Sequence, residues 1–253
     1  MKMKDKTAIV ITGANGNVGS HFAEQYLVTG EFLILIIHNQ EHRVSELQKK
    51  YSENICVIKS DLRDLDKLEK DFAKAVSETD RIPNRLIHTA TIHSYDFKPL
   101  AQSDPELWRN IIEINLIGTF NIMKAVLPYF RKHNYGKVVM FGSNVSRIGL
   151  PNGSAYSASK AGIANIGRTV AVEEAENNII INTVSPGPIK IDDSHFSESY
   201  RQFRKNYYEE KLEDIPLRRH ASFEDIFGLC KFLLSPENSY ITGEEFFITG
   251  GKL

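Results

Sequence analysis

The stretch 12–19 reads TGANGNVG, follows directly on the apolar run Ala8–Ile11 and places glycines at positions 13, 16 and 19. A buried strand that turns through glycines into a helix directs backbone N–H groups at a phosphate, and the missing side chains allow close approach. The stretch therefore predicts a cradle for the pyrophosphate of a dinucleotide. Glycines at such spacing also occur in ordinary tight turns. Whether this turn binds a dinucleotide therefore depends on the other motifs of the chain.

Short runs of β-branched and aromatic residues recur along the chain at intervals that leave room for helices. These runs are TAIVI from 7, FLILII from 32, ICVIK from 55, RLIHT from 85, KVVMF from 137, IIINTV from 179 and EFFIT from 245. Helical patterns between them cover Val18–Thr29, Leu62–Val76, Trp108–Arg131, Ala155–Glu176 and Phe223–Leu234. This alternation predicts an α/β fold of the Rossmann type, with a doubly wound parallel sheet and helices on both faces.

The domain organisation follows from length and composition. The 253 residues are 42% hydrophobic and 25% charged, which is enough apolar material for one sizeable core. We find no internal repeat or Gly/Ser-rich linker, so the sequence predicts a single domain over 1–253. The irregular region 188–215 is rich in Asp, Ser, Tyr, Phe and Glu, and we expect it to form a mobile helical flap on the substrate side.

Charge and hydropathy exclude several function classes. A formal net charge of -1 gives no reason to expect nucleic acid or an anionic membrane as partner. The longest aliphatic run, Phe32–Ile37, is far shorter than the roughly 20 residues that span a bilayer, and the start MKMKDK lacks a signal-peptide pattern. Cys56 and Cys230 have the apolar neighbours of reduced core cysteines. We therefore expect a cytoplasmic protein. His38 and His42 alone are poor evidence for a metal, so we predict none.

A second motif is Tyr156-Ser-Ala-Ser-Lys160. Residues four apart share one face of a helix, so the phenol and the ammonium point the same way. A nearby cation lowers the pKa of tyrosine from about 10, which makes the phenol usable as an acid or base near neutrality. An isolated pair of this kind is more commonly a surface feature, but here other motifs accompany it.

Taken together, these residues resemble the short-chain dehydrogenase/reductase family, in its branch of single-domain enzymes that includes the 3-oxoacyl-carrier-protein reductases. The matching pieces are the glycine turn 12–19, Asp61 and Leu62, Asn115 in EINLIGTF, Ser143 in VVMFGSNVS, Tyr156 and Lys160 in SAYSASKAG, SPGPI at 185–189 and YITGEEFFITGG near the end. Ser143 precedes Tyr156 by thirteen residues and follows Asn115 by twenty-eight. Both spacings suit the catalytic tetrad of the family.

The resemblance implies a role for each member of the tetrad. Tyr156 is the general acid/base that exchanges a proton with the substrate oxygen, and Lys160 lowers the pKa of Tyr156 and holds the nicotinamide ribose. Ser143 orients the substrate carbonyl or hydroxyl, and Asn115 holds a water that links Lys160 to a proton relay. The plainer alternatives are a helix-kink asparagine at 115 and an ordinary turn serine at 143.

The resemblance also implies the residues that hold the cofactor. They are Gly13, Asn15, Gly16, Asn17, Val18, Gly19, His38, Asn39, Arg43, Asp61, Leu62, Thr89, Ala90, Thr91, Tyr156, Lys160, Pro186, Gly187 and Ile189. A carboxylate at the end of the second strand normally selects NAD, but the run there ends in His38 and Asn39, and Glu41 comes later. Arg43 adds positive charge, unless it simply faces solvent. We therefore predict NADP(H). NAD(H) stays the alternative, because the glycine turn itself lacks the basic residue that many NADP-dependent relatives carry.

The glycine spacing departs from the usual TGxxxGxG of this branch. Gly16 comes one residue early and Asn17 occupies the customary glycine position, so we expect Asn17 to adopt the left-handed conformation. The spacing is more typical of epimerase-like relatives, which carry an additional C-terminal substrate domain. We expect no such domain here, because the chain stops shortly after 250–251.

Two further departures flank the predicted cofactor site. The family's Asn-Asn-Ala-Gly stands here as His88-Thr-Ala-Thr91, and Thr91 narrows the space beside the adenosine ribose. We interpret His88 as a structural residue at the strand end. Ile191 stands where relatives often have a threonine, so backbone groups such as that of Ile189 are expected to anchor the nicotinamide.

The predicted function is an NAD(P)-dependent oxidoreductase acting on a small carbonyl compound or secondary alcohol. A nucleotide-sugar epimerase or dehydratase and a non-catalytic NAD(P)-sensing regulator are the alternatives. Relatives that accept acyl carrier protein tend to have basic residues where this chain has Asn134, Asn177 and Asn178, so a carrier-bound substrate is the less favoured case.

By resemblance we expect a homotetramer. The helices 108–131 and 155–177 would pair across one two-fold axis, and the last strand with helix 223–234 across another.

Overall fold

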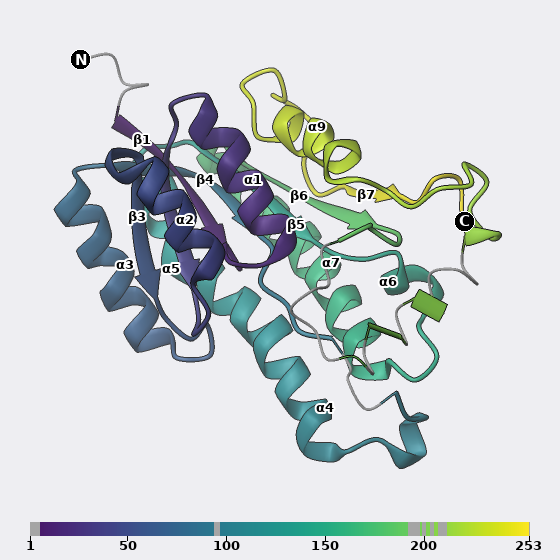
Figure 1. Ribbon diagram of the computed structural model, residues 1–253. Helices are drawn as coiled ribbons and strands as arrows, with labels where there is room; N and C mark the ends of the chain where they lie inside the picture. Colours follow the sequence, from purple (N-terminus) through teal and green to yellow (C-terminus); the bar gives the residue numbers. More distant parts are fainter. Residues whose placement is uncertain are drawn as a thin grey trace.

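The computed structural model describes residues 6–93, 97–191, 198, 201–202, 205–206 and 212–252. These residues form one parallel β-sheet with helices on both faces (Figure 1). The predicted α/β fold is therefore confirmed. Much of the region 188–215 lies outside the described residues, so the flap remains a prediction.

All the predicted strands are present in one seven-stranded sheet with the order β3-β2-β1-β4-β5-β6-β7. They are β1 (Thr7–Thr12), β2 (Phe32–Ile37), β3 (Ile55–Lys59), β4 (Ile82–His88), β5 (Gly136–Phe141), β6 (Ile179–Pro186) and β7 (Glu245–Ile248). The largest difference in bounds is at β4, predicted from Arg85. Its first residues include Pro83, which lies at a register shift against β1, and proline in a run argues against a strand.

The strand order has a switch point at the middle of the sheet. The chain builds β2 and β3 on one side of β1 and then crosses to β4 on the other side. Ligands of doubly wound sheets bind at such a switch point, outside the carboxyl ends of the strands. Thr12 ends β1 and His88 ends β4, in register with each other, so both lie at this switch point.

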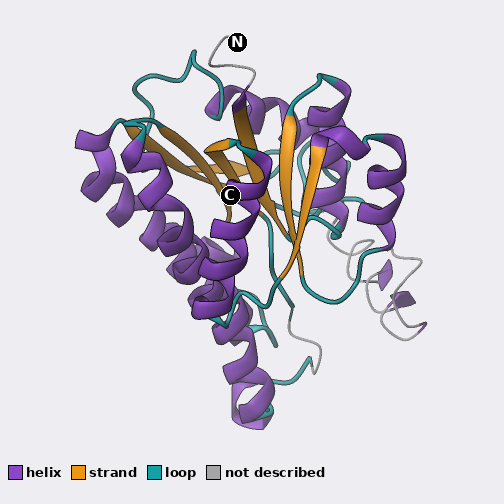
Figure 2. Cartoon of the chain, turned by 90° about the vertical axis from the view of Figure 1, so that its left-hand side faces the viewer, coloured by secondary structure: helices purple, strands orange, loops and turns teal. Residues whose placement is uncertain are grey.

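Helices cover the sheet in two layers (Figure 2). One face is covered by α1 (Asn17–Val28), α2 (His42–Lys50) and α9 (Phe223–Leu233), and the other by α3 (Leu65–Thr79), α5 (Gly118–Lys132) and α7 (Ser154–Glu174). Strand side chains alternate between the layers: Ile9 and Ile11 pack under the first, and Ala8 and Val10 under the second. Each buried aliphatic side chain contributes about 1.5–3 kcal/mol, which explains why the central strands contain long apolar runs.

The predicted helix 108–131 is longer than expected and interrupted. It begins with α4 (Pro105–Ile112), capped by Asp104, passes through a π-helical segment (Glu113–Ile117) and continues as α5. By length and composition the stretch 105–132 would pass as a membrane span, but half of its apolar window is buried inside the protein, as in a core helix. Single π-helical turns often occur at functional sites, and this one contains Asn115. The short helix α6 (Val145–Ile148) precedes α7.

Candidate active site

The glycine turn between β1 and α1 is shaped by its outer glycines. Gly13 has a φ of 63°, and a Cβ there would lie 2.7 Å from the amide N of Ala90. A Cβ on Gly19 would lie 2.4 Å from the carbonyl O of Gly13. Only glycine fits both positions, so the turn packs tightly against the segment just after β4 and against the start of α1. The expected left-handed Asn17 is wrong: Asn17 is the first residue of α1, and Gly13 supplies the positive φ.

The turn has the features of a phosphate cradle. Gly16 is the N-cap of α1, and its N–H donates to the carbonyl of Gly13 at 2.8 Å. The first N–H groups of a helix, here those of Asn17, Val18 and Gly19, have no partner within the helix. They follow the end of β1 at the switch point beside β4, so the turn fits the pyrophosphate of a dinucleotide.

Asn15 links the glycine turn to α2. Its Oδ1 accepts hydrogen bonds from the backbone N–H groups of Arg43 (2.9 Å) and Val44 (3.2 Å), which caps the first turn of α2. The Arg43 guanidinium in turn donates to the carbonyl of Asn15 (3.2 Å) and to Oδ1 of Asn17 (3.4 Å). Arg43 is only partly exposed. The alternative that Arg43 simply faces solvent is therefore wrong, because its charge lies against the glycine turn.

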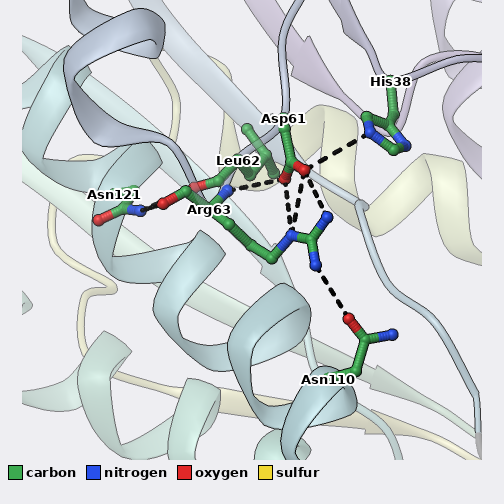
Figure 3. Close-up of polar contacts among 6 residues, drawn as sticks. All are labelled: His38, Asp61, Leu62, Arg63, Asn110 and Asn121. Atoms are coloured by element: carbon green, nitrogen blue, oxygen red, sulfur yellow. Dashed lines mark hydrogen bonds and ion pairs between the residues drawn. The ribbon is translucent and has the colours of Figure 1, made fainter. Parts of the chain in front are cut away.

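Asp61 lies in a charged cluster at the end of β3 (Figure 3). The Arg63 guanidinium binds both carboxylate oxygens of Asp61, with an Nη2···Oδ2 distance of 2.6 Å, and also donates to Oδ1 of Asn110 at 3.0 Å. His38 Nε2 lies 3.5 Å from the same carboxylate. Hydrogen bonds from Arg63 hold the pKa of Asp61 below its usual range. The structure thus brings two of the predicted cofactor residues, His38 and Asp61, together.

The neighbouring residues are fixed by their own contacts. Leu62 is buried, and its carbonyl accepts a hydrogen bond of 2.7 Å from Nδ2 of Asn121 on α5. Asn39 is exposed beyond the end of β2. The carboxylate of Glu41 forms an ion pair with Lys59.

Asn115 is fully buried at the centre of the π-helical segment. Its Oδ1 accepts from the N–H of Ile92 (2.8 Å), and its Nδ2 donates to the carbonyl of Ile92 (2.9 Å) and to Oγ of Ser159 (3.0 Å). Ser159 donates in turn to the carbonyl of Tyr156 at 2.8 Å. The Asn115 amide therefore connects the loop after β4 to the turn of α7 that carries Tyr156. Asn115 also lies in the π-helical segment between α4 and α5, as the helix-kink alternative expects.

Tyr156 and Lys160 lie four residues apart on α7, as predicted, and both are buried. The Lys160 Nζ lies 5.6 Å from the centroid of the Tyr156 ring and donates to the carbonyl of Phe141 at 2.7 Å. Burial lowers the pKa of Lys160 to about 7. At neutral pH this lysine therefore exchanges a proton readily, unlike a surface lysine.

Ser143 lies two residues after Phe141, the last residue of β5. The carbonyl of Phe141 is the group that accepts the hydrogen bond from Lys160. Only 8% of the surface of Ser143 is exposed, and its Oγ lies 3.4 Å from both Oδ1 of Asn144 and the N–H of Val145. These long contacts leave the hydroxyl weakly engaged, so it can bind another partner.

His88 lies at the end of β4 in a buried chain of hydrogen bonds. Its Nδ1 lies 2.6 Å from Oγ1 of Thr12, and its Nε2 lies 2.8 Å from Oγ1 of Thr119. Thr119 donates its hydroxyl hydrogen to the carbonyl of Asn115 at 2.6 Å, so it must accept from His88. His88 is therefore protonated on Nε2, and Thr12 donates to Nδ1. Burial and the nearby Lys160 lower the pKa of His88 to about 3. These contacts agree with the structural interpretation of His88.

The remaining predicted cofactor residues lie at or just after the carboxyl ends of β4 and β6. Thr89 Oγ1 donates to the carbonyl of Thr12 at 2.7 Å, and Thr91 is partly buried beyond it. Pro186 ends β6, and the N–H of Gly187 donates to the carbonyl of Ile248 at 2.9 Å.

Ile189 forms a parallel bridge with Ala221 through the carbonyl of Pro188 and the N–H of Lys190. Because backbone groups alternate in an extended chain, the N–H and C=O of Ile189 itself face away from Ala221.

Sequence reasoning missed Arg63, Thr119, Asn121 and Ser159. Arg63 had a detectable signal, since it stands two residues after Asp61 in the same turn. The partners of Thr119 and Asn121 lie on distant parts of the chain, so no local pattern marks these two residues.

A parallel sheet of this order, with a glycine turn at its switch point and a buried Asn, Ser, Tyr and Lys set behind it, defines a Rossmann-type short-chain dehydrogenase/reductase. A family model described as Enoyl-(Acyl carrier protein) reductase matches residues 13–252, and the chain belongs to this family. The predicted family and enzyme class are thereby confirmed.

Curated relatives cover the whole length of the chain. It is 32% identical to the 3-oxoacyl-(acyl-carrier-protein) reductase FabG of Buchnera aphidicola subsp. Schizaphis graminum, over 99% of this chain and 98% of the relative. It is 30% identical to Oxidoreductase UcpA of Salmonella typhimurium, over 99% of this chain and 95% of the relative.

Solved structures show the same fold. "ElxO with NADP Bound" is 25% identical with a TM-score of 0.86, and the match covers 98% of each chain. A 3-oxoacyl-(acyl-carrier protein) reductase with bound NAD from Brucella melitensis has a TM-score of 0.84 at 21% identity, over 98% of this chain and 92% of that one. One neighbour thus holds NADP and the other NAD.

Proposed function

We propose that this protein interconverts a small carbonyl compound and its secondary alcohol with a nicotinamide cofactor, using Tyr156 as general acid/base. The observation that carries the proposal is the buried Lys160 beside the Tyr156 ring. A lysine is rarely buried without a reason, since burial disfavours its charge. Here it lies beside a phenol whose ionised form it would stabilise.

In the direction of reduction, the Tyr156 hydroxyl donates its proton to the substrate oxygen, which the Ser143 hydroxyl holds by a hydrogen bond. When bound, the nicotinamide supplies the hydride, or accepts it in the reverse direction. The Lys160 ammonium stabilises the phenolate left on Tyr156 and returns a proton to it. Burial sets the pKa of Lys160 to about 7, which suits a proton exchange at neutral pH.

Asn115 is proposed to hold a water that links Lys160 to a proton relay. Both hydrogens of its amide are already donated, to Ile92 and to Ser159. Such a water would therefore donate to the second lone pair of Oδ1. Because both amide hydrogens are already used, the Asn115 side chain would accept a hydrogen bond from this water and donate none.

NADP(H) is the proposed cofactor, and Arg43 is the main support for this choice. The glycine turn has no basic residue of its own, but the Arg43 guanidinium reaches it from α2 and binds Asn15 and Asn17. The 2′-phosphate would meet this charge and His38, and the carboxylates of Glu41 and Asp61 are paired with Lys59 and Arg63. The Gly187 region and the backbone of Ile189 would hold the nicotinamide.

The cofactor proposal is tested by kcat/KM for NADPH and NADH on one substrate. We expect NADPH to be preferred. A preference for NADH would show that a group other than Arg43 reads the ribose, and that NAD(H) is the cofactor.

A small free substrate is proposed over a carrier-bound thioester, although several relatives are named as acyl-carrier-protein reductases. Asn134 and Asn178 have φ values of 47° and 55°, and Nδ2 of Asn178 donates to the carbonyl of Asn134 at 3.2 Å. These asparagines serve two turns, where left-handed backbone favours Asn over Lys or Arg. Comparing a free 3-oxoacyl ester with the same acyl group on carrier protein distinguishes the two substrates.

We further propose a cytoplasmic homotetramer that binds neither nucleic acid nor membrane. Large apolar side chains are exposed on both surfaces expected to pair. They are Ile117 and Phe120 beside or on α5, Val172 on α7, Phe232 on α9 and Tyr240 beyond it. Covering them with a second copy removes apolar area from water.

The decisive experiment is a panel of carbonyl compounds and alcohols, read by the absorbance of the reduced nicotinamide, with Tyr156→Phe as the matched variant. We expect Tyr156→Phe to abolish turnover and leave cofactor binding nearly intact, because only the proton-transfer group is lost. If the variant kept more than roughly a tenth of the wild-type kcat, the acid/base role would be wrong.

A further inference from the structure

His93 contacts the ring of Tyr156 from the loop after β4. The centroids of the two rings lie 4.7 Å apart, and their planes are inclined by 36°. This distance is at the close end of the range for paired aromatic rings. His93 is partly buried, and Tyr156 is almost fully buried with 8% of its surface exposed.

The loop that carries His93 is fixed relative to α7. The Asn115 amide binds both the N–H and the carbonyl of Ile92, the residue just before His93. The same amide donates to Ser159, which donates to the carbonyl of Tyr156. One buried side chain thus holds both the backbone next to His93 and the helical turn of Tyr156.

The Tyr156 ring is also approached by Lys160, whose Nζ is held by the carbonyl of Phe141. A tyrosine side chain can occupy several χ1 rotamers, and only some of them direct its hydroxyl at a given point. Contacts with His93 and Lys160 restrict this choice. General acid catalysis depends strongly on such orientation.

We propose that His93 is a positioning residue, whose ring holds the Tyr156 phenol in the orientation from which its hydroxyl reaches the substrate oxygen. The inference rests on the role proposed for Tyr156. The orientation of the Tyr156 phenol then depends on the shape and packing of the His93 ring. Asn115 holds this ring in place through its hydrogen bonds to Ile92.

Three variants test the proposal: His93→Ala removes the ring, His93→Phe keeps a ring without nitrogens, and His133→Ala changes an exposed histidine at the end of α5 as a control. We expect His93→Ala to lower kcat by about tenfold to a hundredfold, because misplacement of a reacting group by about 1 Å costs that much. The KM for the cofactor should change by less than about threefold. His93→Phe should recover kcat to within about threefold of wild type. The control His133→Ala should have the same kcat as wild type. The proposal is overturned if His93→Ala keeps more than half of the wild-type kcat, or if His93→Phe is as impaired as His93→Ala.

A second measurement needs neither cofactor nor turnover. In protein with 13C-labelled tyrosine rings, the Tyr156 signals are assigned by their loss in Tyr156→Phe. We expect them to shift in His93→Ala and to stay near their wild-type positions in His93→Phe, because the neighbouring ring causes the shift. Unchanged Tyr156 signals in His93→Ala would overturn the proposal. A wild-type protein that is inactive on every carbonyl compound would instead contradict the proposed function. The Tyr156 signals would still test whether the His93 ring packs on the Tyr156 ring.

Discussion

Replacing Lys160 by Met should make the protein more stable while destroying its activity. Burial lowers the pKa of Lys160 from 10.5 to about 7, and at about 1.4 kcal/mol for each pKa unit the cost of its charge is of order 5 kcal/mol. Methionine has a similar length and no charge. It also leaves the carbonyl of Phe141 without the Lys160 hydrogen bond, which costs about 1–3 kcal/mol.

The net gain at pH 7 is therefore of order 2–4 kcal/mol, which raises Tm by about 4–16 °C for a chain of this size. The sign with pH follows from the lowered pKa. Above pH 7 the folded wild type gives up the Lys160 proton while the unfolded chain keeps it, so wild-type stability rises with pH up to about 10. The advantage of Lys160→Met should accordingly shrink between pH 7 and pH 10.

Thermal unfolding of cofactor-free protein at pH 7 and pH 9.5 checks this, with Lys70→Met as control for an exposed lysine on α3. The control should change stability by less than about 0.5 kcal/mol. A Lys160→Met variant that is less stable than wild type at pH 7, or whose advantage grows with pH, would refute the reasoning. Turnover by Lys160→Met should fall at least about a hundredfold, because the partner of the phenolate is lost.

Three further predictions concern the cofactor, the buried histidine and the assembly. Arg43→Ala should weaken NADPH binding by about tenfold or more and leave NADH binding within about threefold; equal losses for both cofactors, measured by fluorescence titration, would show that Arg43 acts only through the glycine turn. Because burial and Lys160 lower the pKa of His88 to about 3, the wild type should lose stability relative to His88→Gln as pH falls from 6.5, by about 1.4 kcal/mol per pH unit; urea unfolding at pH 7 and pH 4.5 measures this, and a constant difference would contradict it. Light scattering should give a tetramer for the wild type and a smaller species for the double variant Phe120→Lys and Val172→Lys, whereas a wild-type monomer at micromolar concentration would rule the assembly out.

The prediction of the fold succeeded where the signal is local. The apolar runs mark β1 to β7, and in fully buried strands such as β2 this is because both faces need apolar side chains at almost every position. The bounds failed at Pro83 in β4 and at the interrupted helix around Asn115, where the backbone departs from regular structure. The conformation of Asn17 was also wrong, because a left-handed residue is needed once in the turn and Gly13 already provides it.

The sequence by itself determined the class of the protein and the pairing of Tyr156 with Lys160, since four residues along a helix bring two side chains to one face whatever surrounds them. Only the tertiary structure decided where the Arg43 charge lies, which groups the Asn115 amide binds and that His93 packs on Tyr156. Those contacts join segments 23 to 63 positions apart in the chain. Their geometry depends on how strands and helices are placed against one another, and that placement results from the packing of the whole core rather than from any local spacing.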